Sequence, residues 1–103
     1  MSLTETLPVY RDTYRLIQLI YLRTRDFSRE YKYTLGQDMK RDSIMLVRSI
    51  YRANRSESKR QWLEEFLDVF EILNLEIRLC VDLCLISPAH QSGISFVLSS
   101  LPD

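Results

Sequence analysis

The sequence predicts an all-α protein, and in particular an antiparallel up-down four-helix bundle. Helical hydrophobic periodicity occurs four times along the 103 residues, whereas no stretch alternates apolar and polar residues for long. The chain has only two glycines and three prolines, which favours long elements over many turns. Short polar connections between amphipathic helices are typical of antiparallel bundles. We therefore expect a single domain, residues 1–103, with helices over about 7–27, 35–53, 58–85 and 88–101.

The first two predicted helices have recognisable start signals. Pro8 suits the first turn of the first helix. Residues at three- and four-residue steps predict one buried stripe on this helix, formed by Tyr10, Tyr14, Ile17, Ile20, Tyr21 and Thr24. Thr34 and Gln37 fit a capping box before the second helix, and Asn54 fits a left-handed cap at its end. The predicted core stripe of the second helix is Leu35, Met39, Ser43, Leu46, Ile50 and Ala53.

The third predicted helix is the longest and is apolar on two sides. Ser56 or Ser58 can cap its start. The stripe expected in the core is Leu63, Phe66, Phe70, Leu73, Ile77, Cys80 and Cys84. A second apolar set lies beside it and consists of Val69, Ile72, Leu79, Leu83 and Ile86. A helix that is apolar over more than one stripe needs more than one packing partner.

A short fourth helix is expected after Ser87 and Pro88, which are typical of an N-cap and a first helical position. Its apolar side consists of Ile94, Val97, Leu98 and Leu101. A three-helix bundle, with residues 88–103 frayed, is the alternative interpretation.

The net charge of zero conceals a division along the chain. Residues 1–62 hold 13 of the 14 basic residues and 7 acids, a net charge of +6, whereas residues 63–103 hold one basic residue and 7 acids, a net charge of −6. Such asymmetry indicates a surface for an anionic partner or for self-association. Ten of the 13 basic residues in the first part are arginines, whose guanidinium groups match phosphate oxygens bidentately.

Four of these arginines are spaced by seven, four and three residues and therefore share one face of the second predicted helix. With their basic neighbours they form the set predicted to contact phosphates: Lys40, Arg41, Arg48, Arg52, Arg55, Lys59 and Arg60. Such contact would be largely non-specific and would weaken with added salt. The alternative is a helix surface that is solubilised by charge and paired with Asp38, Asp42 and Glu57. Tyr31 and Tyr33 would either stack on unpaired bases or pack onto the bundle.

Little in the sequence supports catalysis, a metal or a cofactor. His90 is the only histidine, so no nucleophile–histidine pair stands out. Gly36 alone does not make a phosphate loop and is expected to be a close-packing residue. Cys80 and Cys84 lie on neighbouring turns and are expected to be buried, unreactive thiols. The acids of the third helix lack the Glu-x-x-His companion of dinuclear metal sites and are expected on a solvated face: Glu64, Glu65, Asp68 and Glu71. We expect a protein that is not an enzyme.

No apolar run approaches the ~20 residues that a membrane span requires. The first residues lack the basic segment and apolar core of a secretory signal. These two features predict a cytoplasmic protein without a membrane partner.

Three stretches carry a resemblance to a known family: "EYKYTLGQDMKRD", "IYRANRSESKR" and "LCVDLCLIS". Over roughly residues 25–90 the chain resembles the accessory variability determinant (Avd) proteins of diversity-generating retroelements. These belong to a wider group of small four-helix-bundle proteins that includes products of intervening sequences in bacterial ribosomal RNA genes. The resemblance implies a homopentamer that binds the retroelement's reverse transcriptase and RNA or an RNA/DNA hybrid, and that supports mutagenic copying of a template RNA.

The resemblance also gives the two surface sets a use. The basic set would contact nucleic acid or the reverse transcriptase, and the second apolar set of the third helix, Val69 to Ile86, would form the oligomer interface. Two alternatives stay open: an oligomerisation scaffold that contacts only protein, and a bundle protein of the intervening-sequence type with another role. A small enzyme or metal carrier is a third hypothesis, against which the single histidine argues.

Overall fold

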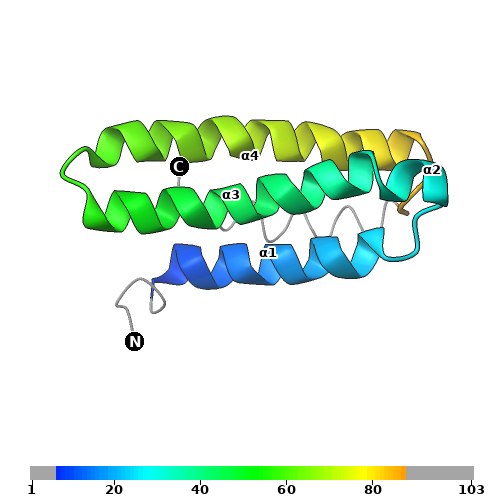
Figure 1. The fold of residues 1–103 in the computed structure, drawn as a ribbon, viewed down its shortest axis with the longest axis horizontal. Helices are drawn as coiled ribbons and strands as arrows, with labels where there is room; N and C mark the ends of the chain where they lie inside the picture. The colour runs from blue at the N-terminus through cyan, green and yellow to red at the C-terminus, as the bar shows by residue number, and fades with distance from the viewer. Residues whose placement is uncertain (1–6, 88–103) are drawn as a thin grey trace.

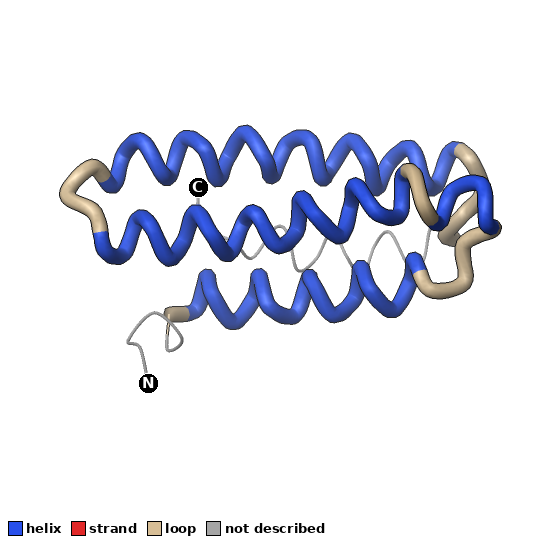
Figure 2. Tube along the Cα trace, viewed as in Figure 1, coloured by secondary structure: helices blue, strands red, loops and turns tan. Residues whose placement is uncertain are grey.

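Three long helices and one single turn make up the part of the chain that the structure describes, residues 7–87: α1 (Pro8–Thr24), α2 (Arg29–Lys32), α3 (Leu35–Arg55) and α4 (Lys59–Asp82). In this computed structural model α3 runs antiparallel to both α1 and α4 (Figure 1). Figure 2 shows α2 at the end of the molecule where α1 connects to α3. Residues 7–87 contain no strand, so the all-α prediction is confirmed. The predicted fourth helix lies outside the described residues.

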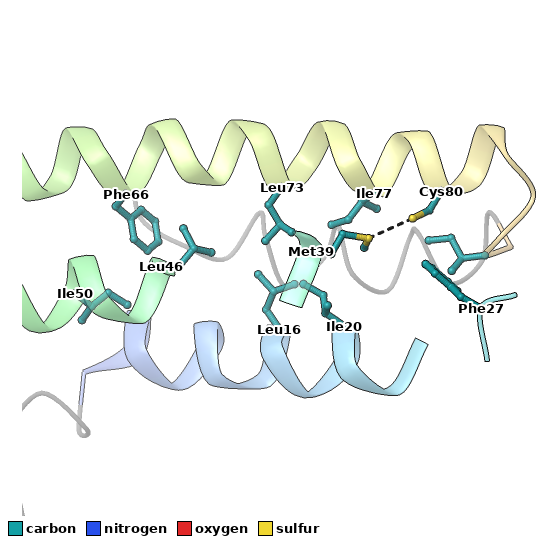
Figure 3. Packing of buried hydrophobic residues seen from close by; sticks show 11 residues of the cluster. Leu16, Ile20, Phe27, Met39, Leu46, Ile50, Phe66, Leu73, Ile77 and Cys80 are labelled. Carbon is teal, nitrogen blue, oxygen red and sulfur yellow. Dashed lines mark hydrogen bonds between the residues drawn. The ribbon is translucent and has the colours of Figure 1, made fainter. Parts of the chain in front are cut away.

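The core lies between the three long helices. Figure 3 shows its side chains pointing inward from all three. Seven of them are at most 1% exposed: Leu16, Ile20, Met39, Leu46, Leu73, Ile77 and Cys80. Burial of such side chains is the main favourable term in folding, at roughly 25 cal/mol per Å². On α3 the predicted stripe is confirmed at Met39, Ser43, Leu46 and Ile50, all of which are buried. Because these residues share one face, the opposite face of α3 lies toward solvent.

The buried face of α1 differs from the predicted one. Ile20 and Thr24 of the predicted stripe are buried, but Tyr14 and Tyr21 are 52% and 45% exposed. The other two buried residues of this helix, Thr13 and Leu16, were not predicted. The two threonine hydroxyls donate hydrogen bonds to carbonyl oxygens one turn earlier, at 2.7 Å from Thr13 to Val9 and at 2.8 Å from Thr24 to Ile20. Because these hydroxyl groups are satisfied within the helix, burying them costs little. The prediction was wrong at Tyr14 and Tyr21, because it placed these tyrosines in the core and omitted Thr13 and Leu16.

The connections around α3 also correct the predicted caps. Thr34 makes no side-chain cap bond to α3, and its hydroxyl donates to the Glu30 carbonyl oxygen at 2.8 Å instead. α3 does not end at Asn54 but continues to Arg55 and is followed by an extended Ser56. The close-packing prediction for Gly36 is confirmed, because a Cβ there would lie 3.2 Å from the Tyr31 carbonyl oxygen.

The α3–α4 turn is held by hydrogen bonds from its own polar residues. The Ser58 amide donates to Ser56 Oγ at 2.9 Å, and Lys59 Nζ donates to the Ala53 carbonyl oxygen at 2.9 Å. The lysine therefore satisfies one of the carbonyl groups that a helix end leaves without a partner.

α4 ends earlier than predicted because the chain forms a Schellman motif. The Leu85 amide donates to the Cys80 carbonyl oxygen at 2.8 Å, and the Cys84 amide donates to that of Val81 at 3.0 Å. Cys84 has a left-handed φ of 62°, which this motif normally assigns to glycine. The two cysteines therefore do not share a helix face: Cys80 is buried, as predicted, whereas Cys84 is exposed.

Replacing Cys84 with glycine is expected to stabilise the protein by about 1 kcal/mol, because glycine adopts positive φ without a Cβ clash. Urea unfolding followed by circular dichroism measures the change. Cys84→Ala is the matched control, since it removes the thiol but keeps the Cβ atom. A glycine variant no more stable than the alanine variant would contradict the strain assigned to this residue.

Candidate nucleic-acid interface

The predicted arginine face lies on the side of α3 opposite its core stripe. At 100° per residue, arginines spaced by seven, four and three residues share one face, and the buried Met39, Leu46 and Ile50 share the other. Arg41, Arg48 and Arg55 are exposed and Arg52 is half-buried. This part of the expected site is therefore one continuous surface, which begins in the middle of α3 and ends at its C-terminus.

Two of the predicted arginines have acidic partners. Arg41 lies 3.3 Å from an Asp38 carboxylate oxygen and 3.4 Å from one of Asp42. Arg60, at the start of α4, lies 3.4 Å from Glu64. The pairs of Arg41 with Asp38 and of Arg60 with Glu64 are exposed and contribute little to stability, but all three pairs neutralise the local charge. Arg41 and Arg60 are therefore weaker candidates for phosphate contact than the sequence suggests.

Three arginines of the face have no such partner. Among residues 7–87, no carboxylate lies within ion-pairing distance of Arg48, Arg52 or Arg55. Arg48 makes only a weak contact with the sulfur of Met45 at 3.7 Å. The guanidinium carbon of Arg52 lies 4.8 Å from the centre of the Trp62 ring, a cation–π arrangement. The C-terminal half of α3 therefore presents positive charge that the described chain does not balance.

The two lysines of the predicted set are engaged within the protein. Lys40 Nζ lies 5.2 Å from the centre of the Tyr21 ring, and Lys59 closes the α3–α4 turn through its bond to Ala53. Lys40 also explains why Tyr21 tolerates exposure, because its ring contacts a cation on the neighbouring helix. Of the tyrosines considered for stacking, Tyr33 is 65% exposed and Tyr31 packs against the core.

Trp62 is the part of this surface that the sequence analysis missed. It lines a cavity of about 340 Å³ where the start of α1 meets the α3–α4 turn. The other residues around this cavity are mostly apolar: Leu7, Val9, Ser49, Ile50, Ala53, Asn54, Lys59, Leu63 and Phe66. Trp62 also borders a shallower hollow of about 400 Å³, together with Arg52, Arg55 and Ser56. The only sequence signal was that the single tryptophan follows the last arginine of the stripe by seven residues.

Only part of the second apolar set of α4 is exposed in the structure. Ile72, Leu79 and Leu83 are 53%, 43% and 40% exposed, and their face includes Leu75, which the prediction omitted and which is 63% exposed. Val69 is half-buried and packs against the core. Ile86 is buried within it at 7% exposure, so it cannot belong to an exposed interface in the way that was predicted. Ile86 follows the Schellman turn, and it is therefore not on the helical face assumed for it.

Two carboxyl groups lie together in the α3–α4 interface beside Arg41. Asp42 Oδ2 and Glu76 Oε1 are both buried and have no hydrogen-bond partner within the described chain. The pKa of Glu76 is raised to about 8, first by burial and then by the neighbouring Asp42 and Asp38. A proton on Glu76 therefore removes the repulsion between the two groups at neutral pH. Neither residue lines the cavity at Trp62.

The described residues contain no cluster of three or more metal-ligating side chains.

The Cys80 thiol is buried, and this burial, with a smaller effect of Glu76, raises its pKa to about 12. The thiol donates a hydrogen bond to the sulfur of Met39 at 3.3 Å. His90 lies outside the described residues. Within residues 7–87 no helix is both long and apolar enough to span a membrane.

Comparison of the chain with protein-family models, with curated proteins and with solved structures gave no match.

The stability of the wild type relative to Glu76→Gln is expected to fall as the pH rises from about 5 to about 9. Because the pKa of Glu76 in the folded protein, about 8, exceeds its ordinary value of 4.5, the folded state keeps a proton that the unfolded chain releases. This stabilisation is therefore complete below pH 4.5 and is lost as the pH passes 8. Urea unfolding of both proteins at several pH values measures the difference.

Glu71→Gln provides the matched control, because Glu71 is an exposed acid on the same helix. Its stability should follow that of the wild type over the whole pH range. A difference between wild type and Glu76→Gln that does not change with pH would contradict the raised pKa.

Proposed function

We propose that this chain is a non-enzymatic accessory protein of a diversity-generating retroelement, which binds nucleic acid and acts as an oligomer beside the reverse transcriptase during mutagenic copying of template RNA. The observation that carries the proposal is the C-terminal half of α3, where three exposed or half-exposed arginines lack a carboxylate partner among residues 7–87. The resemblance over roughly residues 25–90 supports the particular role. A cytoplasmic location and a fourth helix over about 88–101 belong to the same proposal.

The geometry of the arginine face suits a phosphate backbone. From Arg48 to Arg55 the helix rises by about 10 Å at 1.5 Å per residue, which matches about three nucleotides of a duplex strand at 3.4 Å each. Guanidinium groups bind phosphate oxygens without reading base sequence. Three phosphate contacts would give the binding constant a log–log salt slope of roughly −2 to −3.

The double substitution Arg48→Glu/Arg52→Glu is expected to abolish salt-sensitive binding of RNA and of an RNA/DNA hybrid, because it replaces two unpaired cations with anions. The milder Arg48→Gln/Arg52→Gln pair should reduce the salt slope by about 1.5 to 2. Fluorescence anisotropy of labelled strands between about 50 and 200 mM salt measures both effects, and circular dichroism checks that helicity is retained.

Arg11→Glu/Arg15→Glu is the matched control, because these exposed arginines of α1 have the same four-residue spacing and the same change in charge. This variant should retain most of the binding. Unchanged binding by the α3 variant, or an equal loss in both variants, would contradict the assignment of the site to α3.

The exposed apolar face of α4 is proposed as the contact between subunits. It consists of Ile72, Leu75, Leu79 and Leu83, which are 40–63% exposed, with Val69 at its edge. Four large apolar side chains in one row are more than scattered exposure explains, and such patches commonly mark interfaces. The resemblance suggests that five subunits assemble through this face.

Leu75→Glu/Leu79→Glu is expected to convert the oligomer into monomers, because it places two charges in the proposed contact. Light scattering coupled to size exclusion measures the mass. The control is Leu22→Glu, which changes a leucine of α1 with similar exposure, 42%, and should leave the mass unchanged. An identical mass for wild type and the α4 variant would exclude this face as the contact.

The same apolar face favours a second candidate, an oligomerisation scaffold that contacts only protein. Such a scaffold would form the oligomer but would not be retained on immobilised RNA at low salt. A third assignment, to the intervening-sequence group, is distinguished by the genomic neighbourhood, because a retroelement protein lies near a reverse transcriptase gene and paired repeats.

A further inference from the structure

The cavity at Trp62 has the size and lining of a binding site for a small planar group. Its volume of about 340 Å³ lies at the lower end of the roughly 300–1,000 Å³ of small-molecule sites. Trp62 and Phe66 contribute aromatic rings to its wall, and Ile50 and Leu63 contribute aliphatic side chains. The polar residues of the lining are Ser49, Asn54 and Lys59. The lining therefore suits a ring that has polar atoms at its edge.

A hollow lined by two arginines lies directly beside this cavity. Trp62 borders both the cavity and the adjoining hollow, whose other residues are Arg52, Arg55 and Ser56. Arg52 lies over the Trp62 ring at 4.8 Å, and neither arginine has a carboxylate partner in the described part of the chain. A ligand that joins a planar ring to a phosphate group would occupy both spaces at once.

We propose that the cavity receives one unpaired base of a bound nucleic-acid strand, with the adjoining phosphate on Arg52 and Arg55. This inference rests on the proposed function and specifies its substrate: strands with unpaired bases. A paired base is held in its stack and must be flipped out before it can enter a pocket. Backbone contacts along α3 would hold any strand, whereas the cavity adds affinity only for an unpaired base.

Trp62 is the only tryptophan in the chain, so its fluorescence reports occupancy of the cavity directly. Titration with a short single-stranded RNA of mixed sequence is expected to quench this fluorescence to saturation. The blunt duplex of the same sequence, at equal phosphate concentration, should bind with little quenching. A strand of abasic sugar-phosphate units should also bind without quenching, because it supplies the phosphates but no base.

Trp62→Leu is expected to weaken single-strand binding by about tenfold, in line with the loss of one stacked base, and to weaken duplex binding much less. Trp62→Phe should restore most of the single-strand affinity because it returns an aromatic ring. Anisotropy of labelled strands measures both variants, and circular dichroism checks their folding. If Trp62→Leu does not fold, the quenching comparison on the wild type decides the question alone.

The outcomes separate this inference from the function on which it rests. If the wild type binds neither single strands nor duplex, the proposed function itself fails. If single strands and duplex quench the fluorescence of the wild type equally, the proposed base-binding site is wrong. The same holds if Trp62→Leu weakens the binding of single strands and of duplex equally. Quenching by the abasic strand would show that only phosphate contact perturbs Trp62. Quenching by oleate, with none by single-stranded RNA, would show that the cavity binds an acyl chain and not a base.

Discussion

The burial of one face of α3 is the constraint on which the rest of the structure depends. This helix contacts α1 and α4 at once, so Met39, Leu46 and Ile50 must all point into the space between them. Its opposite face carries the arginines, and rotation of α3 about its axis would bury one of them. Removing an unpaired charge from water costs several kcal/mol. Core burial and arginine solvation therefore fix the same orientation, and the basic surface is a direct consequence of how the bundle packs.

The periodicity of the sequence was sufficient to predict the helices but not the face that each one buries. On α3 the apolar and charged residues lie on opposite sides, so only one orientation was reasonable. On α1 the single predicted stripe combined tyrosines with Ile20 and Thr24, and it omitted the buried Thr13 and Leu16. The threonines are buried because their hydroxyls bond to Val9 and Ile20, a local arrangement that hydrophobicity does not encode. The Schellman turn at Cys84 could not be predicted from the sequence either, because the glycine that usually marks this motif is absent.

The candidate site was predictable in its location but not in its composition. Sequence spacing placed four arginines on one face, yet it could not show that Arg41 is paired with Asp38 and Asp42 whereas Arg48 and Arg55 are not. That distinction depends on side-chain distances in the folded helix. The role of Trp62 depends on contacts between α3 and α4, which place its ring under Arg52 and beside a cavity. No residue type or spacing within one helix reports such a contact.

The division of charge along the chain becomes a division between surfaces in the structure. Three arginines without a carboxylate partner among residues 7–87 share one face of α3, whereas acids such as Asp68 and Glu71 accompany the exposed apolar face of α4. A nucleic-acid strand near the molecule would be attracted by the arginines of α3 and repelled by the acids beside the apolar face of α4, within a Debye length of about 10 Å at 0.1 M salt. If α4 provides the subunit contact, its acids keep nucleic acid off that face without any steric barrier. The two proposed functions of this bundle therefore need not compete for the same surface, because the sequence separates their charges.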